Sequence, residues 1–201
     1  MLTEAQAYFK AWNVPVMSWW LEPHLQPSDW EMHLGRSGLR YDRGTPGMAA
    51  DLRGLPEEGM AVADLQVLAV QDAPALRTWA HTMVAGFGLP PAWEPGLLAL
   101  VDGLGFDPPM RHYLGSLHGQ PVAIATLFLA AGVAGLQYLA TVPDARGRGI
   151  ARAMAVTALR RARTLGYRAA ILQSSEMGYN PFGLQLGFRA LSHFGYSYWA
   201  R

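Results

Sequence analysis

The stretch from Pro143 to Met154, PDARGRGIARAM, decides how the second half of this chain is interpreted. A strand pattern ends at Val142, and a proline breaks it before the glycine-rich loop begins. Gly147 and Gly149 have no Cβ, so their N–H groups can approach a ligand closely. The alanine-rich run that follows predicts a helix whose first turn adds unpaired N–H groups and a positive dipole end. This junction of loop and helix predicts a cradle for linked phosphates.

Two other phosphate-binding loops fit this stretch less well. The loop of P-loop nucleotidases needs a lysine after its second glycine, and the only lysine in the chain is Lys10. The dinucleotide-binding turn needs a third glycine where Arg152 stands, and an acidic residue about twenty positions later that is missing here. A turn that only connects strand to helix is the remaining alternative. We expect the loop amides to hold the phosphates, while Arg146 and Arg148 add positive charge.

Composition limits the classes of function. The chain has 201 residues, 51% of them hydrophobic, which suffices for one domain and an appendage. A net charge of +1 provides no overall field for nucleic acid or an anionic membrane, so neither is expected as a partner. Because cysteine is absent, disulfides, a thiol nucleophile and cysteine-based metal sites are excluded, and no metal is expected. The opening MLTEAQAYFK does not resemble a secretory signal, which favours a cytoplasmic protein.

Residues 113–143 contain no charged side chain. A membrane helix needs about 20 apolar residues, so this alternative has to be weighed. However, β-forming residues alternate at Val122, Ile124 and Thr126, a turn is indicated at Gly132, and flanking basic anchors are absent. We therefore predict two neighbouring buried strands and no membrane contact.

From residue 65 onward, strands and helices are predicted in a regular series. Asp72 is a suitable N-cap for the first helix, and Gly166 a suitable end for the third. The predicted strands lie at 65–70, 110–117, 120–130, 135–142, 168–175 and 188–200, the last as one strand or a bent pair. The predicted helices lie at 71–87, 90–105, 149–165 and 177–187.

The hexapeptide at 146–151, RGRGIA, is similar to the R/Q-x-x-G-x-G/A signature of the GNAT acetyltransferase superfamily. The order of strands and helices from Leu65, and the Leu-Gly-Phe at 186–188, resemble that superfamily as well. The resemblance covers residues 65–201 and implies an α/β (α+β) fold, with a mixed, mostly antiparallel central sheet flanked by helices. It also implies that the fourth strand of this fold, at 135–142, splays apart from the fifth strand, which follows the long helix.

The first 60 residues indicate a strand, a short helix and a second strand. This order is similar to the C-terminal end of the chain, and Gly38-Leu39-Arg40 matches Gly187-Phe188-Arg189. We predict a partial N-terminal repeat of the GNAT fold at 1–60 beside a transferase domain at 65–201, with coincidence as the alternative. Such a lobe could swap into a second copy of the chain, so a homodimer is one expected assembly.

The resemblance implies acetyl-coenzyme A (acetyl-CoA) as the donor substrate, bound between the splayed strands. The backbone of Ala140, Thr141 and Val142 would pair with its pantetheine arm. Its pyrophosphate would be held by the amides of six consecutive residues: Arg146, Gly147, Arg148, Gly149, Ile150 and Ala151. Asn180 would add a side-chain contact, with an ordinary turn residue as the alternative.

The catalytic residues of the superfamily are only partly matched. Many members carry a glutamate base where this chain has Gln137, which cannot accept a proton at neutral pH. Many also carry a tyrosine acid four residues before the glycine of the Leu-Gly-Phe motif, where this chain has Gly183. Tyr179 and Tyr138 are the candidates for that acid, although tyrosines are often simply packed aromatics.

His112 and His118 are the candidates for a base. Both are predicted at a strand end or turn, where a histidine is usually a surface residue.

These features predict transfer of an acetyl group to the primary amine of a small-molecule or peptide acceptor, by direct attack of the amine on the thioester. The alternative is a degenerate acetyl-CoA sensor or scaffold, which Gln137 and Gly183 favour. Nucleic-acid contact through the arginines of 146–168 has less support because the net charge is small. The superfamily sets acceptor specificity in regions that correspond to 87–95 and 192–198; both are aromatic and weakly charged here, which favours a small or apolar amine.

Overall fold

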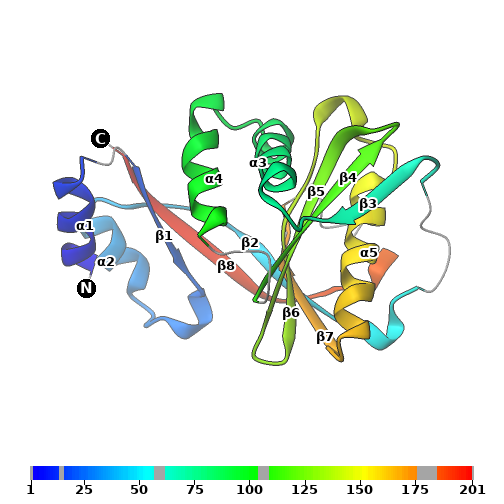
Figure 1. Ribbon diagram of the computed structural model, residues 1–201. Coiled ribbons are helices and arrows are strands. Elements are labelled where there is room, and N and C mark those ends of the chain that lie inside the picture. The colour runs from blue at the N-terminus through cyan, green and yellow to red at the C-terminus, as the bar shows by residue number, and fades with distance from the viewer. Residues whose placement is uncertain (1, 14–15, 57–61, 104–108, 176–184, 201) are drawn as a thin grey trace. The chain divides into compact units, whose positions relative to one another are not determined.

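The computed structural model describes residues 2–13, 16–56, 62–103, 109–175 and 185–200. The chain forms two compact units (Figure 1). Unit 1 comprises Met1–Met48, Gln173–Tyr179 and Ala190–Arg201, and unit 2 comprises Ala49–Leu172 and Asn180–Arg189. The predicted division into residues 1–60 and 65–201 is a different partition of the chain and stays a prediction.

Unit 2 is built on the strands β7-β6-β5-β4-β3, in that spatial order. Neighbours are antiparallel except β6 and β7, which are parallel. The strands are β3 (Leu65–Ala69), β4 (Met110–Leu117), β5 (Gln120–Ala130), β6 (Val133–Thr141) and β7 (Ala169–Gln173), whose last residue belongs to unit 1. The predicted mixed, mostly antiparallel sheet is therefore confirmed.

The uncharged run at 113–143 forms strands of this sheet, as predicted. Ala131 and Gly132, with φ of 49° and 75°, make the tight turn between β5 and β6. Ile124 and Ala125 point to opposite faces of β5, yet both are fully buried, which explains why the strand is apolar throughout. Within the described residues, no helix combines the length and the apolar composition needed to cross a bilayer.

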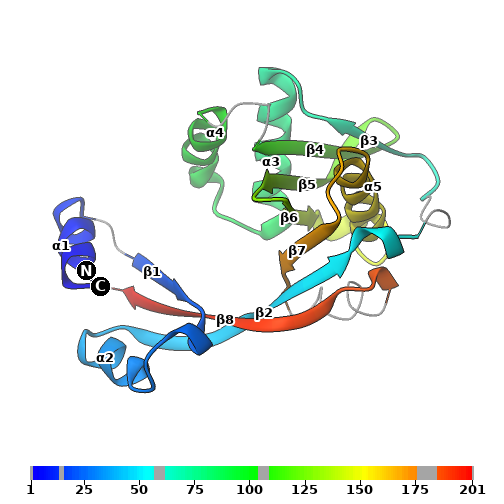
Figure 2. The same ribbon diagram turned by 90° about the horizontal axis from the view of Figure 1, so that it is seen from below.

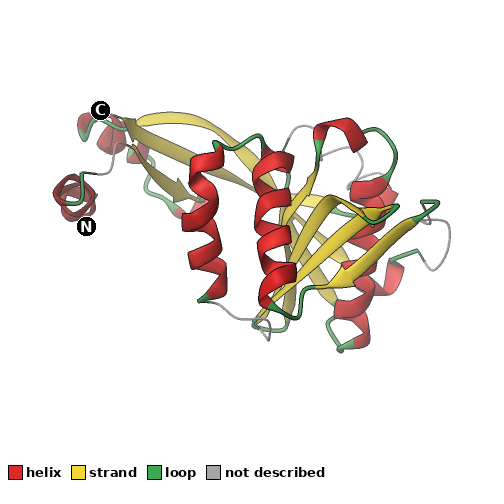
Figure 3. Cartoon of the chain, turned by 45° about the horizontal axis from the view of Figure 1, so that its top comes forward, coloured by secondary structure: helices red, strands yellow, loops and turns green. Residues whose placement is uncertain are grey.

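Three helices cover the sheet of unit 2: α3 (Ala73–Phe87), α4 (Glu94–Asp102) and α5 (Ile150–Thr164). Helices α3 and α4 lie side by side on one face, and α5 lies on the other (Figures 1 and 3). On the α3 face, Trp79 packs in one core cluster with Ile124 and Ala140. On the α5 face, Met154 fills the space that Gly115 leaves, since a Cβ there would lie 2.5 Å from its sulfur.

The ends of α3 follow the predicted chemistry. The Asp72 side chain accepts a hydrogen bond from the Ala75 amide at 2.8 Å, and Gly88 ends the helix with a φ of 65°.

Four short 3-10 turns lie between the longer elements: η1 (Pro23–Leu25), η2 (Leu52–Gly54), η3 (Pro91–Trp93) and η4 (Pro143–Ala145).

Unit 1 contains the strand order β1-β8-β2 (Figure 2). Its elements are α1 (Leu2–Ala11), β1 (Val16–Leu21), α2 (Trp30–Arg36), β2 (Arg40–Asp51) and β8 (Arg189–Ala200), the last two of which extend into unit 2. Met17 and Leu21 of β1 form a buried core with Leu34 and Leu39. Leu2, Ala5 and Phe9 of α1, a helix that the sequence analysis did not predict, pack against this core.

The two matching tripeptides adopt the same local structure. Gly38 and Gly187 have positive φ values of 76° and 74°, and Leu39 and Phe188 after them are buried. Each tripeptide ends on the arginine that begins a strand of 12 residues, β2 or β8. The partial repeat itself stays a prediction.

Candidate functional site

The pairing of β6 with β7 stops early. Only Val133, Ala134 and Gly135 have partners on β7, the last opposite Ile171, although β6 continues to Thr141. The edge of β6 after Gly135 is therefore open on its β7 side. This is the splay that the sequence analysis predicted between the fourth and fifth strands of the fold.

A β-bulge lies in the open part of β6. Thr126 of β5 pairs with Gln137 and Ile124 pairs with Ala140, so Ala125 faces two residues instead of one. The first of these two, Tyr138, has a φ of 46°, a left-handed conformation that bulges of this kind normally give to glycine. A non-glycine residue in this region costs about 1–3 kcal/mol, and such strain is concentrated at functional sites.

The Tyr138 side chain is 37% exposed and contacts α3. Its ring lies edge-on to that of Trp79, with centroids 6.1 Å apart. The Trp79 ring in turn lies 4.6 Å from His112, whose Nδ1 is 2.8 Å from the Thr126 hydroxyl. The bulge thus places Tyr138 and the exposed Gln137 next to each other, with a buried aromatic and polar cluster beneath Tyr138.

His112 is not the surface residue that the sequence analysis expected. It lies within β4, is 1% exposed, and burial lowers its pKa to about 4, so the ring is neutral at pH 7. Its Nε2 has no hydrogen-bond partner among the described residues, and the same holds for Trp79 Nε1 and Thr141 Oγ1. His118, by contrast, is exposed at the β4–β5 turn, with Nε2 3.9 Å from Asp64.

The loop after β6 has the predicted open backbone. Gly147 and Gly149 have φ values of 75° and 76°, and Gly149 is an N-cap without a side-chain hydrogen bond. The first hydrogen bond of α5 runs from the Ala153 amide to the Gly149 carbonyl at 3.0 Å. The amides of residues 147–152 consequently have no acceptor within the described part of the chain.

Arg146 is held by the protein itself. Its guanidinium donates to the carbonyl oxygens of Thr141 at 3.1 Å and Gly86 at 2.8 Å, and its amide donates to Pro143 at 3.2 Å. The side chain therefore fastens the end of β6 to the C-terminal end of α3. Arg148 is exposed and has no ion pair in the described residues, so its charge stays available.

The predicted donor-site residues Ala140 to Ala151 thus lie along one continuous strand end, loop and helix start. Two of them have amides that are directed elsewhere, because the Arg146 amide donates to the Pro143 carbonyl and the Val142 amide donates to the Val122 carbonyl of β5 at 2.9 Å. Asn180, Tyr179 and Gly183 lie outside the described residues. Trp79, Thr126 and the bulge were not predicted, since the strand-to-strand register that creates them is not visible in a local pattern.

A family model described as "Acetyltransferase (GNAT) family" matches residues 76–187, more than half of the chain. The chain belongs to this family. No curated protein matches it in a sequence search. The GNAT family transfers acetyl groups from acetyl-CoA, so an acetyltransferase fold and an acceptor substrate in general follow from membership.

Solved structures share the fold of this GNAT protein at low sequence identity. A GCN5-related N-acetyltransferase from Kribbella flavida is 18% identical with a TM-score of 0.74, covering 98% of this chain and 72% of its own. One from Sphaerobacter thermophilus is 17% identical with a TM-score of 0.72, at 98% and 65% coverage. A tandem GNAT protein from the clavulanic acid biosynthesis pathway is 11% identical with a TM-score of 0.65, at 98% and 67%.

The site fits the donor substrate of the family. Unpaired amides at a helix N-terminus suit a pyrophosphate. No atom lies within 4 Å of the point that a Cβ on Gly147 would occupy, and beside Gly149 the nearest atom is Val62 Cγ2 at 3.8 Å. The open edge of β6 offers backbone groups to an extended amide-containing arm. The amine acceptor, the homodimer and the cytoplasmic location stay predictions.

Proposed function

We propose that this GNAT protein transfers the acetyl group of acetyl-CoA to the primary amine of a small-molecule or peptide acceptor, by direct attack of the amine. The observation that carries the proposal is the run of unpaired amides from Gly147 to Arg152, which begins beyond the open edge of β6. Acetyl-CoA supplies an activated thioester when bound.

The roles of the residues follow from their positions. The amides of 147–152 and the free charge of Arg148 would hold the pyrophosphate. Ala140 and Thr141 would pair with the pantetheine arm, although the Thr141 carbonyl already accepts from Arg146. Arg146 would act by positioning the loop rather than by contacting phosphate with its side chain. Asn180 remains a proposed contact.

The bulge supplies the catalytic candidates. Gln137 would orient the amine by a hydrogen bond, and Tyr138 beside it would donate a proton to the departing thiolate. The attacking nitrogen would lose its proton to water, from which Tyr138 would be reprotonated. Backbone amides along the open edge would stabilise the negative charge that develops on the carbonyl oxygen. Tyr179 is the second candidate for the acid. His112 is buried and neutral, so it would support Trp79 and Tyr138 rather than exchange protons with substrate.

Calorimetry and a thiol-release assay test the proposal together. We expect acetyl-CoA to bind, and a panel of primary amines to release coenzyme A thiol in the presence of the protein. Tyr138→Phe should lower kcat about 10- to 100-fold while leaving acetyl-CoA affinity unchanged. Tyr8→Phe, on the exposed surface of α1, is the matched control and should have no effect. Absence of acetyl-CoA binding would refute the proposal.

The second candidate function is a non-catalytic acetyl-CoA sensor. Gln137 favours it, because an amide occupies the position where many family members carry a base. Binding of acetyl-CoA without thiol release from any amine would support this candidate over the transferase.

A further inference from the structure

The last paired residues before the open edge of β6 form a row across three strands. Gly135 of β6 lies opposite Phe128 of β5 and opposite Ile171 of β7, and the three strands are neighbours in the sheet (Figure 2). Residues directly opposite each other on paired strands point to the same face of a sheet. Phe128, Gly135 and Ile171 therefore share one face, and we call them the apolar row.

The apolar row lies on the face that carries α3, but α3 does not cover it. Thr126, two residues before Phe128, contacts His112 beneath Trp79 of α3, which places Thr126 and Phe128 on that face. The side chains of Phe128 and Ile171 are nevertheless 37% and 49% exposed, although β6 lies between their strands. Two large apolar side chains exposed in one row mark a candidate contact surface for a ligand.

The middle of the row is low because Gly135 has no side chain. The amide nitrogen of Gln137 lies 3.7 Å from the point that a Cβ on Gly135 would occupy, and Phe128 Cβ lies 3.6 Å from that point. One hydrogen-bonding amide is therefore placed beside two apolar side chains. This arrangement suits a ligand that carries one polar group on an apolar body.

The row also lies at the closed end of the proposed donor site. The amides of 147–152 follow the C-terminal end of β6, so a pantetheine arm along the open edge would run from this loop back toward Gly135. Its thioester would then lie near Gln137 and the apolar row. An amine that attacks the thioester has to be held at the same end.

The three strands that carry the row contain no charged residue. Neither β5, β6 nor β7 includes an aspartate, glutamate, lysine or arginine. The row thus offers no partner to a charge on the body of an acceptor, and burial of an unpaired charge is costly. Apolar surroundings also favour the neutral form of the reacting amine, which is the form that attacks a thioester.

We propose that the apolar row binds the acceptor, and that this acceptor is a primary amine on an uncharged, apolar body. The inference rests on the proposed acetyl transfer and names its substrate class. The body would pack against Phe128 and Ile171 above Gly135, and the amine would form a hydrogen bond with the amide of Gln137.

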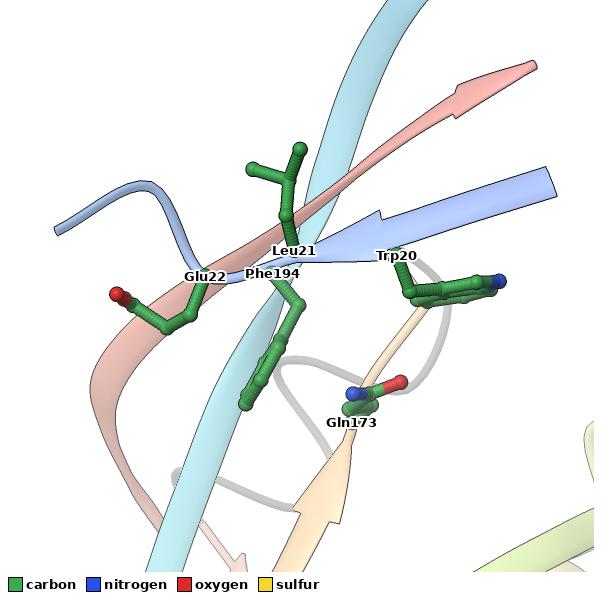
Figure 4. Close-up of a pocket in the computed structure, with 5 residues that line it drawn as sticks. All are labelled: Trp20, Leu21, Glu22, Gln173 and Phe194. Carbon is green, nitrogen blue, oxygen red and sulfur yellow. The ribbon is translucent and has the colours of Figure 1, made fainter. Parts of the chain in front are cut away.

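Unit 1 offers a second apolar surface as a competing location for the acceptor. A hollow of about 350 Å³ is lined by Trp20, Leu21, Glu22, Gln173 and Phe194 (Figure 4). Trp20 is 54% exposed, so Trp20→Ser removes much of the apolar surface of this hollow and changes no residue of the apolar row. This variant tells which of the two surfaces binds the acceptor.

Acetylation of three amines with the same six-carbon chain, n-hexylamine, 1,6-diaminohexane and 6-aminohexanoate, tests the proposal in the full chain. We expect kcat/KM for hexylamine to exceed that for either charged amine at least about tenfold. Phe128→Ser and Ile171→Ser should each raise the KM for hexylamine about 5- to 10-fold and leave acetyl-CoA affinity unchanged. Leu68→Ser and Leu165→Ser remove exposed leucines elsewhere in unit 2; they are the matched controls and should behave as the original protein does.

A charge placed in the apolar row gives a second test. Ile171 is half exposed, so Ile171→Glu should remain folded by circular dichroism. It should lower the KM for 1,6-diaminohexane about fivefold and raise that for 6-aminohexanoate, because the new carboxylate attracts the second ammonium and repels the carboxylate. Loss of folding cannot produce such a gain.

Equal kcat/KM for the three amines, an unchanged KM for hexylamine in both serine variants of the row, or a raised KM in Trp20→Ser alone would each overturn the proposal. Failure of acetyl transfer gives a different result, in which no amine is acetylated. Calorimetry with hexylamine in the presence of coenzyme A then decides. Binding that Phe128→Ser weakens would support the apolar row as an amine site without transfer, and absence of binding would overturn it.

Discussion

Helices α3 and α5 are both 15 residues long and cover opposite faces of the same sheet, yet their N-termini differ. The N-cap of α3 is Asp72, whose carboxylate accepts a hydrogen bond from the Ala75 amide. The N-cap of α5 is Gly149, which makes no side-chain hydrogen bond and leaves the first amides of the helix without a partner among the described residues. Relative to a glycine N-cap, a capping side chain stabilises a helix by only a few tenths of a kcal/mol, which α5 lacks.

The difference supports the proposal that the N-terminus of α5 binds a ligand. The backbone contributes to it as well, because the φ of 76° at Gly149 favours glycine, whereas Asp72 has an extended backbone. A side chain at position 149 would occupy the amides that a pyrophosphate needs. In α3, the side chain of Asp72 caps the N-terminal amides. In α5, the proposed ligand would accept hydrogen bonds from the N-terminal amides instead.

The largest expected effect comes from making α5 like α3. Gly149→Asp places a carboxylate at the open amides, where it competes with phosphate and repels it. We expect acetyl-CoA affinity, measured by calorimetry, to fall at least about 1,000-fold. Aspartate tolerates positive φ better than most residues, so the protein should remain folded by circular dichroism.

Gly166→Asp is the matched control for this substitution. Gly166 also has a positive φ, 94°, and no atom lies within 4 Å of the point that a Cβ would occupy, but it follows the other end of α5. Affinity for acetyl-CoA should not change there. Equal loss of affinity in both variants would mean that strain, rather than occupation of the amides, explains the result.

The second prediction concerns His112, which lies buried beneath α3, and the pH dependence of stability. Trp79 of α3 lies on the buried, neutral His112, whose pKa of about 4 is below its ordinary value of 6.5. Between these pH values the unfolded chain binds more protons than the folded one, so stability falls as pH falls. We expect the free energy of unfolding in urea to drop by about 3 kcal/mol from pH 7 to pH 4 through this group.

His112→Gln removes the titrating ring and keeps a polar partner for Thr126. Its unfolding free energy should lose most of that pH dependence, whereas His118→Gln on the exposed turn should retain it. If His112→Gln showed the same slope as the original protein, other groups would be responsible for the acid sensitivity.

The third prediction separates two arginines of the loop before α5. Arg146→Ala removes hydrogen bonds to Gly86 and Thr141, so it should lower the unfolding free energy by about 2 kcal/mol. Arg148→Ala removes an unpaired charge, so it should leave stability unchanged and weaken acetyl-CoA about 3- to 10-fold, less so at high salt. Urea unfolding and calorimetry of both variants check this. The reverse pattern would show that Arg146 contacts the ligand.

The contrast between these arginines shows what the sequence could predict. The loop, its glycines and the helix after it follow from local residue patterns, and all three are found. The partner of Arg146 could not be found in this way, because Gly86 is 60 residues distant in sequence. From the sequence, an arginine beside a phosphate-binding loop is expected to add its charge to the phosphate site. In the structure, the Arg146 guanidinium donates to the carbonyls of Thr141 and Gly86 instead.

The same limit applies to the strands. Alternation and apolar runs predicted β5 and β6, and the splay followed from the family resemblance. The bulge at Tyr138 and the burial of His112 depend on how three strands are aligned with one another. Helix α1 was overlooked because MLTEAQAYFK has only a weak apolar stripe, and it is stabilised by packing Leu2, Ala5 and Phe9 against unit 1.

The smallest expected effect comes from making α3 like α5. Asp72→Ala opens the N-terminus of α3, and the lost cap should lower the unfolding free energy in urea by about 1 kcal/mol. Acetyl-CoA affinity should not change, because these amides face no proposed ligand. Asp29→Ala is the control, since Asp29 precedes α2 without making a side-chain cap and should cost less. If Asp72→Ala lowered the affinity for acetyl-CoA as much as Gly149→Asp does, the effect would not be specific to the N-terminus of α5. The uncapped amides of α5 would then not be evidence for a binding site.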